Sequence, residues 1–268
     1  MIAQSGLETI GESFGFFEYA KIGLPVLIVG IIFFVTIGYK LLPDNVANED
    51  ADSIYSQEKS YEDVPEWKVW VSLIVLIFTV LAMVLEKKIG IKLFVSAWIG
   101  ALVLVVTGVI SSSDAIKSID MNTILLYVGS LALASALKET GTGDLIANSI
   151  VSKLGDNPSP TALMIIIFII CAILTNFMSN TATTALMVPI SISISQAIGA
   201  DPRAVLMATV IGGSMAYATP IGMPANTMVY NVGGYKFNDY VKAGLPLIIV
   251  CGTLSLILLP IFFPFFPN

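Results

Sequence analysis

Ser179, Asn180 and Thr181 interrupt a long apolar stretch that runs from residue 161 to residue 196. Each apolar arm has about 15 residues, fewer than the roughly 20 that a helix rising 1.5 Å per residue needs to cross a bilayer. The pattern therefore favours a re-entrant hairpin with these three residues at its tip, where irregular backbone must be buried in protein or line a wet cavity. A polar tip of this kind predicts a binding site. The alternative is a plain helix N-cap, a role that Ser, Asn and Thr fill well.

A second polar break covers residues 219–227, Thr-Pro-Ile-Gly-Met-Pro-Ala-Asn-Thr. We expect a helix from about Arg203 to end there, because each proline removes a backbone donor and clashes with the preceding turn. The freed carbonyls and the side chains of Thr219, Asn226 and Thr227 supply hard oxygen ligands for a small alkali cation. The N-terminus of the resumed half-helix favours an anion. The alternative is a proline kink that serves only helix packing.

The composition indicates an integral membrane protein. Only 12% of the 268 residues are charged, whereas a soluble domain carries about 25%. The chain has no His, and its apolar interiors contain no Asp or Glu. A proton relay through a membrane normally needs a titratable side chain, so the sequence favours Na⁺ over H⁺ as a coupling ion. The same absence argues against an enzyme and against a zinc or haem site, and the net charge of −6 argues against binding nucleic acid.

Long apolar runs predict membrane-spanning helices at about residues 23–42, 69–85, 93–110, 123–137 and 241–263. Residues 44–66 contain eight acidic residues and no apolar period, so we expect a solvent-exposed linker there.

The chain contains an internal echo. Residues 19–25 read Tyr-Ala-Lys-Ile-Gly-Leu-Pro, residues 240–246 read Tyr-Val-Lys-Ala-Gly-Leu-Pro, and an apolar run follows each. The shared spacing indicates an internal repeat in which each copy opens the last helix, with Pro in the first turn. Aligning the two copies places Met1 opposite Met228. We therefore expect the first helix to be the tail of a first repeat.

Two motifs resemble those of the divalent anion/sodium symporters, the sodium/sulfate and di- and tricarboxylate symporters of the ion transporter superfamily. One is Ser179-Asn180-Thr181, similar to the family's hairpin-tip Ser-Asn-Thr. The other is residues 214–229, Ser-Met-Ala-Tyr-Ala-Thr-Pro-Ile-Gly-Met-Pro-Ala-Asn-Thr-Met-Val, similar to a signature of Ser, an aromatic residue, Pro-aliphatic-Gly and Asn-x-aliphatic-Val. Tyr217 stands where the signature usually has Phe. The resemblance covers nearly the whole chain as the second half of such a transporter.

The resemblance implies an all-α polytopic membrane protein, half of an inverted-repeat transporter with a re-entrant hairpin and a broken transmembrane helix. The implied parts are the terminal helix of a first repeat (1–42), the acidic linker (43–66) and a second repeat (67–268). The second repeat would contain the hairpin (about 161–198), the broken helix (about 203–232) and the final helix (about 241–263). The implied substrate-binding residues are Ser179, Asn180, Thr181, Pro224, Asn226 and Thr227. The implied Na⁺ ligands are Thr175, Met178 through its carbonyl, Asn180, Ala218 and Thr219.

The resemblance also implies Na⁺-coupled transport of a small divalent anion (dicarboxylate, citrate or sulfate) by elevator-like alternating access. The expected location is the plasma or inner membrane, with several spans and with no cofactor besides the coupling ion. In the family, a corresponding site in the first repeat completes the binding site. We therefore expect assembly with a second copy of this chain or with a separately encoded first half. The alternative is a truncated half-transporter that is inactive alone or only binds the anion and Na⁺.

Overall fold

The computed structural model describes residues 2–43, 64–119 and 159–266, together with isolated positions between 121 and 149. Every regular element in these residues is a helix, which confirms the all-α prediction. The chain divides into two compact units. The first contains residues 1–54 and 123–268, and the second contains residues 55–122. The predicted span at 123–137 and most of the predicted linker fall outside the continuously described ranges.

Two helices are long and apolar enough to cross a membrane, α4 (Glu66–Val84) and α14 (Phe237–Phe262). Four shorter helices are also apolar: α2 (Ala20–Thr36), α6 (Leu93–Val106), α10 (Pro160–Leu174) and α12 (Pro202–Gly212). The predicted span at 23–42 is divided, since α2 ends at Thr36 and the 3₁₀ helix η1 covers Gly38–Leu41. The predicted span at 93–110 ends earlier, at Val106, two residues before Gly108 adopts a left-handed φ of 73°.

The second unit is a helical hairpin. Helices α4 and α6 pack against each other, and the short helices α5 (Glu86–Ile89) and α7 (Ser112–Lys117) follow them along the chain. Gly100 permits this packing, because a Cβ there would lie 2.3 Å from Thr79 Oγ1. No residue of α4 is buried, and large apolar side chains such as Trp70 and Phe78 are exposed. A helix that is apolar on its outer faces is typical of a lipid-facing segment.

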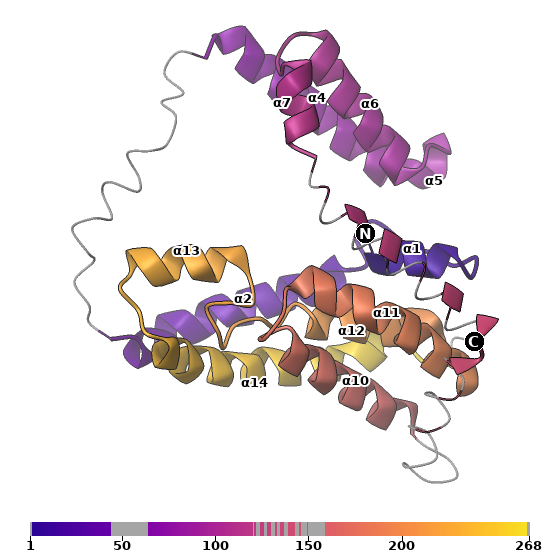
Figure 1. The fold of residues 1–268 in the computed structure, drawn as a ribbon, viewed down its shortest axis with the longest axis vertical. Coiled ribbons are helices and arrows are strands. Elements are labelled where there is room, and N and C mark those ends of the chain that lie inside the picture. The colour runs from indigo at the N-terminus through magenta and orange to yellow at the C-terminus, as the bar shows by residue number, and fades with distance from the viewer. Residues whose placement is uncertain are drawn as a thin grey trace. The chain divides into compact units, whose positions relative to one another are not determined.

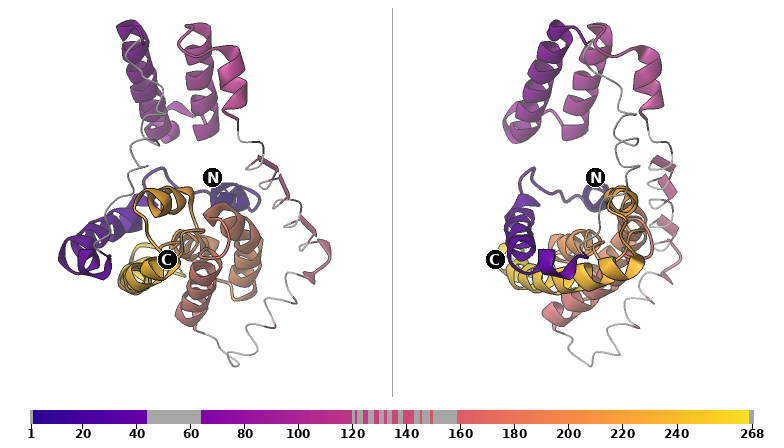
Figure 2. Two further views of the ribbon diagram at one scale, coloured as in Figure 1. Left: turned by 60° about the vertical axis from the view of Figure 1, so that its left-hand side comes forward. Right: turned by 90° about the vertical axis from the view of Figure 1, so that its left-hand side faces the viewer.

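The first unit has its core where α2, α10, α12 and α14 meet. The buried cluster includes Ile22, Phe168, Met207 and Leu247, one from each helix. Helix α12 packs against α10, α11 (Asn180–Ala197) and α14, and α2 packs along α14 (Figure 1). The views of Figure 2 show the same grouping from two other directions. The short helices α1 (Ile2–Glu8) and α13 (Pro224–Val232) complete the unit.

The two echoed prolines lie inside their helices, contrary to the prediction of a first-turn position. Helix α2 begins at Ala20 and contains Pro25, while α14 begins at Phe237 and contains Pro246. Asp239 stabilises the earlier start of α14 by accepting a 2.9 Å hydrogen bond from the Lys236 N–H. A proline in a helix has no N–H to donate, yet both helices continue past their prolines, and α2 packs along α14.

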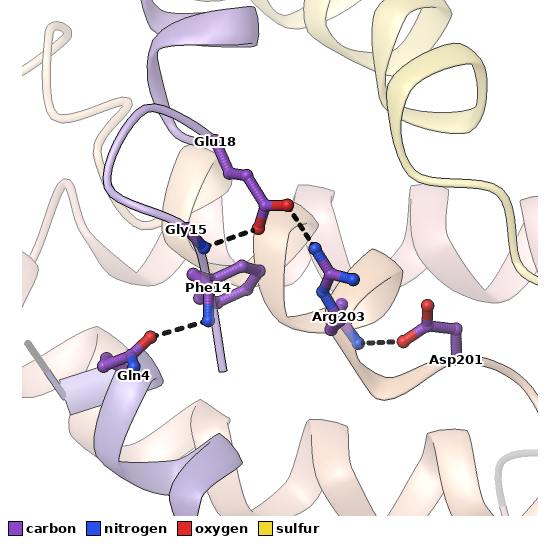
Figure 3. Close-up of polar contacts among 6 residues, drawn as sticks. All are labelled: Gln4, Phe14, Gly15, Glu18, Asp201 and Arg203. Carbon is purple, nitrogen blue, oxygen red and sulfur yellow. Dashed lines mark hydrogen bonds and ion pairs between the residues drawn. The ribbon is translucent and has the colours of Figure 1, made fainter. Parts of the chain in front are cut away.

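An ion pair fixes the segment before α2 to the start of α12 (Figure 3). Arg203 donates to the Glu18 carboxylate, whose other oxygen accepts from the Gly15 N–H at 3.0 Å. The Asp201 carboxylate accepts from the Arg203 N–H at 2.8 Å and caps α12. Burial acts to raise the pKa of Glu18, but the hydrogen bonds from Arg203 and Gly15 outweigh it, so the pKa falls below its ordinary value. Two segments 185 residues apart are thereby held together.

Candidate functional site

Two interruptions of the helices lie against each other in the first unit. Residues 175–179 separate α10 from α11, and residues 213–223 separate α12 from α13. The first break lies in the interrupted apolar stretch that the sequence singles out, and Ser179 is the N-cap of α11. Its hydroxyl accepts from the Ala182 N–H at 3.2 Å, and Asn180 and Thr181 form the first turn. The non-helical residues between α10 and α11 therefore precede Asn180 and Thr181, and the N-cap interpretation describes the local role of Ser179.

The second break begins earlier than the sequence predicts. Helix α12 ends at Gly212, whereas the prolines pointed to an end near Thr219. Gly212 packs directly on α10, since a Cβ there would lie 2.7 Å from the Phe168 carbonyl oxygen. The chain then runs without helical structure to Met223 and resumes as α13. The irregular segment therefore extends from Gly213 to Met223 and begins seven residues before the first proline of the break, Pro220.

Thr175 connects the two breaks. Its hydroxyl is buried and lies 2.7 Å from Asn180 Oδ1 and 2.6 Å from the Gly213 carbonyl oxygen. Thr175 and Asn180 were both predicted Na⁺ ligands, and the fold brings their oxygen atoms into contact. Gly213 was not predicted. Three oxygen atoms thus converge at the point where α10 ends, α11 begins and α12 ends.

Asn176 replaces the missing backbone partners of the second break. Its Nδ2 donates to the Ala172 carbonyl at 2.7 Å and to the Met215 carbonyl at 3.0 Å. Its Oδ1 accepts from the Ala218 N–H at 2.9 Å. Buried backbone groups that leave a helix need such partners, because an unpaired group in an apolar interior is strongly unfavourable. Asn176 was not among the predicted site residues, and its only signal in the sequence was its position next to Thr175.

Side chains that were expected to bind ligands hold the second break in shape. Thr219 Oγ1 donates to the Asn176 carbonyl at 2.6 Å, and Thr227 Oγ1 donates to the Pro220 carbonyl at 2.7 Å. Asn226 Nδ2 donates to the carbonyls of Ala216 and Thr219 at 2.7 and 2.9 Å. Several freed carbonyls are therefore already paired. Each carbonyl oxygen and each hydroxyl still has a second lone pair that a cation can use.

Gly222 sets how closely the breaks approach. A Cβ at this position would lie 2.8 Å from the Thr175 carbonyl oxygen and 2.8 Å from the Ala216 Cβ. Real Cβ atoms do not approach that closely, so only glycine allows this contact.

The remaining predicted residues lie at the edge of the breaks. Met178, Asn180 and Thr181 are half-buried, whereas Ser179, Pro224 and Thr227 are exposed. In the described parts of the chain, no hydrogen bond joins Met178, Ser179 or Thr181 to the second break. Thr183 was not among the predicted site residues. Its hydroxyl is buried and has no hydrogen-bond partner among the residues that the structure describes.

The electrostatic character of the site comes from neutral groups. Helices α11 and α13 both begin at the breaks, and a helix N-terminus carries partial positive charge and free N–H donors that favour an anion. Hydroxyl, amide and carbonyl oxygens favour a hard cation such as Na⁺. Among the described residues, no group of three or more His, Cys, Asp or Glu side chains could hold a transition metal.

Comparison with known proteins assigns the family. The family model described as "Citrate transporter" matches residues 1–212 and 80–267. The chain belongs to the citrate transporter family. The resemblance to divalent anion/sodium symporters is thereby confirmed, and the chain is a transporter-family membrane protein and not an enzyme.

Several relatives carry transporter names. An uncharacterized transporter of Escherichia coli (strain K12) is 35% identical over 156 residues, which are 58% of this chain and 25% of that protein. Solute carrier family 13 member 2 of Oryctolagus cuniculus is 33% identical over 142 residues, 53% of this chain and 23% of that protein. An uncharacterized transporter of Methanocaldococcus jannaschii is 26% identical over 240 residues, 88% of this chain and 54% of that protein. In each comparison the aligned region spans well under two thirds of the relative's own length.

Proposed function

We propose that the two apposed helix breaks form a binding site for a small divalent anion and Na⁺ in secondary active transport. The observation that carries this proposal is the bonding between residues 175–180 and 213–219, which places buried oxygen atoms beside the starts of α11 and α13. The family assignment supports citrate as the transported anion, and a dicarboxylate or sulfate belongs to the same proposal.

In this proposal Na⁺ binds to Thr175, Asn180, the Met178 carbonyl and the second break at Ala218 and Thr219. The anion binds to Ser179, Asn180 and Thr181 and to the start of α13, at Pro224, Asn226 and Thr227. Bound Na⁺ would neutralise part of the anion's charge, which explains why the two ligands would bind together. No other cofactor is needed.

Transport would occur by elevator-like alternating access across the plasma or inner membrane, with several spans. Because the aligned region is 25% of the Escherichia coli relative, the complete site would need a second contribution, from a second copy of this chain or a separately encoded first half. The alternative function is a half-transporter that binds anion and Na⁺ without moving them, or that is inactive alone.

The test is ligand-induced thermal stabilisation of the purified chain in lipid nanodiscs. Na⁺ with citrate, succinate or sulfate should raise the unfolding temperature, because a ligand at 100 times its Kd stabilises a fold by about 2.7 kcal/mol. Choline in place of Na⁺ is the salt control. Asn180→Ala should remove the rise, while Gln4→Ala, in α1 and hydrogen-bonded to Glu8 and Phe14 outside both breaks, should keep it. An equal rise with choline, or no loss in Asn180→Ala, would contradict the assigned site.

Uptake into proteoliposomes separates the two functions. Na⁺-dependent uptake by the chain alone would support transport by copies of this chain, and stabilisation without uptake would support the binding-only alternative.

A further inference from the structure

A small pocket in the first unit lies between the end of α2, the second break and the beginning of α14. Its volume is about 240 Å³. Helix α2 and η1 both pack against α14, so the helical walls of the pocket are held together (Figure 1). The aromatic and polar side chains that line it are Phe34, Tyr217, Asn226, Tyr235, Asp239 and Tyr240. Four aromatic rings and one carboxylate therefore share a single pocket.

Two of the aromatic walls form a corner. The ring centroids of Tyr235 and Tyr240 lie 6.2 Å apart, and the ring planes are at 89° to each other. The Tyr240 hydroxyl donates to the Asn226 carbonyl at 2.7 Å, which fixes the direction of that ring. The Tyr230 ring packs beside it, with the centroids 6.1 Å apart. Because the walls are already in place, a ligand would lose little affinity to ordering of the protein.

Asp239 is the one charged residue in the lining of this pocket. Its Oδ2 accepts from the Lys236 N–H at 2.9 Å, but in the described parts of the chain no Lys or Arg side chain forms an ion pair with it. Lys236 is exposed, and the Lys40 ammonium lies over the ring of Tyr39, 5.6 Å from its centroid. A half-buried carboxylate without a cationic partner favours a cation from outside the chain.

The kind of cation follows from the aromatic rings. Na⁺ prefers a shell of oxygen ligands, whereas the faces of aromatic rings attract organic ammonium groups and form the characteristic cages for quaternary ones. The methyl groups of such a cation can also contact the apolar side chains of the lining, Val229 and Leu247 among them. Asp239 disfavours an anion in the same pocket.

We infer that this pocket binds a quaternary or N-methylated ammonium group, with Asp239 as its counter-charge and Tyr235 and Tyr240 as its walls. Soluble compounds and lipid headgroups both carry this chemistry. An interfacial belt would also place tyrosines near a helix end, but it would not bring them into one pocket with a carboxylate. The pocket shares only Asn226 with the residues proposed for the anion and Na⁺, so the inference does not rest on the proposed function.

Calorimetric titration with choline tests the pocket. The full chain is titrated in dodecyl maltoside and potassium chloride, without Na⁺ and without citrate, succinate or sulfate. Choline should bind saturably, and its uncharged analogue, with a tert-butyl group in place of trimethylammonium, should bind about tenfold more weakly or worse. Equal binding of the two compounds would overturn the inference in favour of a plain apolar pocket. An absence of choline binding would overturn it outright.

Variants locate the binding. Asp239→Asn keeps an acceptor for the Lys236 N–H and removes the charge, and Tyr235→Leu removes one wall, so each should weaken choline binding about tenfold. Tyr235→Phe keeps the ring and should bind as the wild type does. Tyr39→Leu is the matched control, because Tyr39 is an exposed tyrosine of η1 outside the pocket. Equal affinities of Tyr235→Leu and Tyr235→Phe would overturn the inference, even if Asp239→Asn failed to fold.

Lipid nanodiscs distinguish the two sources of the ammonium group. Choline should bind to the chain in phosphatidylglycerol, a lipid without an ammonium group, and a failure to bind there would contradict the detergent result and the inference. Unchanged binding in phosphatidylcholine would assign the pocket to a soluble compound, and lost binding would assign it to the lipid headgroup.

These titrations contain no transport ligand, so their failure is separate from a failure of Na⁺-dependent stabilisation. Choline is also the salt control for that stabilisation, and Asp239→Asn provides the same control without this pocket.

Discussion

Thr175 and Asn176 are consecutive residues directly after α10, and together they pair three backbone groups of the second break, the carbonyls of Gly213 and Met215 and the N–H of Ala218. Both are buried and uncharged. In an apolar environment a neutral amide or hydroxyl can substitute for a helix hydrogen bond without the large desolvation penalty of a charge. These two side chains therefore stabilise the second break, and the same oxygen atoms are candidate ligands for a cation.

Replacing Thr175 by Val should destabilise the chain by about 1–3 kcal/mol, because the isosteric side chain leaves the Gly213 carbonyl without its donor. Thermal unfolding in nanodiscs measures this loss. Thr175→Ser keeps the hydroxyl and should retain most of the stability and any Na⁺ response. If Val and Ser variants unfold at the same temperature, the hydroxyl does not hold the two breaks together.

Replacing Asn176 by Leu should have a larger effect, about 3 kcal/mol or more, since it removes two donated hydrogen bonds and one accepted bond at a buried position. The unfolding temperature and limited proteolysis between Gly213 and Met223 are the measurements. Asn226→Leu is a comparison at a half-buried position with two donated bonds. A smaller effect for Asn176→Leu than for Asn226→Leu would contradict the central role of Asn176.

At the scale of elements, glycines decide how closely the helices and the breaks pack. Gly212 brings α12 onto α10, Gly222 brings the second break onto the first, and Gly244 brings α14 onto the second break. None of these three positions has a positive φ, so the requirement for glycine comes from close approach and not from backbone conformation. Helix contacts this close are typical of membrane proteins, where small residues let backbones meet.

Gly244→Ala and Gly23→Ala form a matched pair for the two echoed helices. Alanine at 244 would place its Cβ 2.0 Å from a backbone oxygen, and the resulting strain should cost about 1–3 kcal/mol. Alanine at 23 meets only the exposed ring of Tyr19 and should change the unfolding temperature of the isolated chain little. Comparable losses in both variants would show that Gly23 already has a backbone neighbour.

In the molecule as a whole, the two units are stabilised by different kinds of contact. The first unit is held by its core and by polar bonds between distant segments, including the Glu18–Arg203 ion pair. The second is a helical hairpin whose outer faces are apolar. The aligned region covers 25% of the Escherichia coli relative, and transport by a larger assembly is part of the proposed function.

The Glu18–Arg203 ion pair predicts a pH dependence of stability. The pKa of Glu18 is lower in the folded chain than its ordinary value, so the ionised form stabilises the fold. This contribution should be fully present above the ordinary glutamate pKa of about 4.3 and should be lost as the pH falls through the lower folded value. Unfolding temperatures of the wild type and Glu18→Gln, measured from pH 7 downwards, should therefore converge as the pH falls. A difference that stays constant with pH would exclude this ion pair as a source of the dependence.

The helical class, the membrane character, the family resemblance and the existence of two breaks could all be predicted from the amino-acid sequence. These follow from local properties: apolar length, the prolines at 220 and 224, and polar residues such as Asn180 inside an apolar stretch. It also determined the echo of residues 19–25 and 240–246, because spacing along a chain is visible without a fold.

Only the tertiary structure decided that α12 ends at Gly212, that Ser179 is an N-cap and that Asn176 pairs the second break. It also decided that the echoed glycines face different surroundings, a backbone at Gly244 and an open groove at Gly23. The physical reason is the separation of the bonded groups along the sequence. A sequence pattern shows which residues leave a helix, but the partners of the freed groups are atoms 38 to 43 residues away. Packing alone brings them within hydrogen-bonding range.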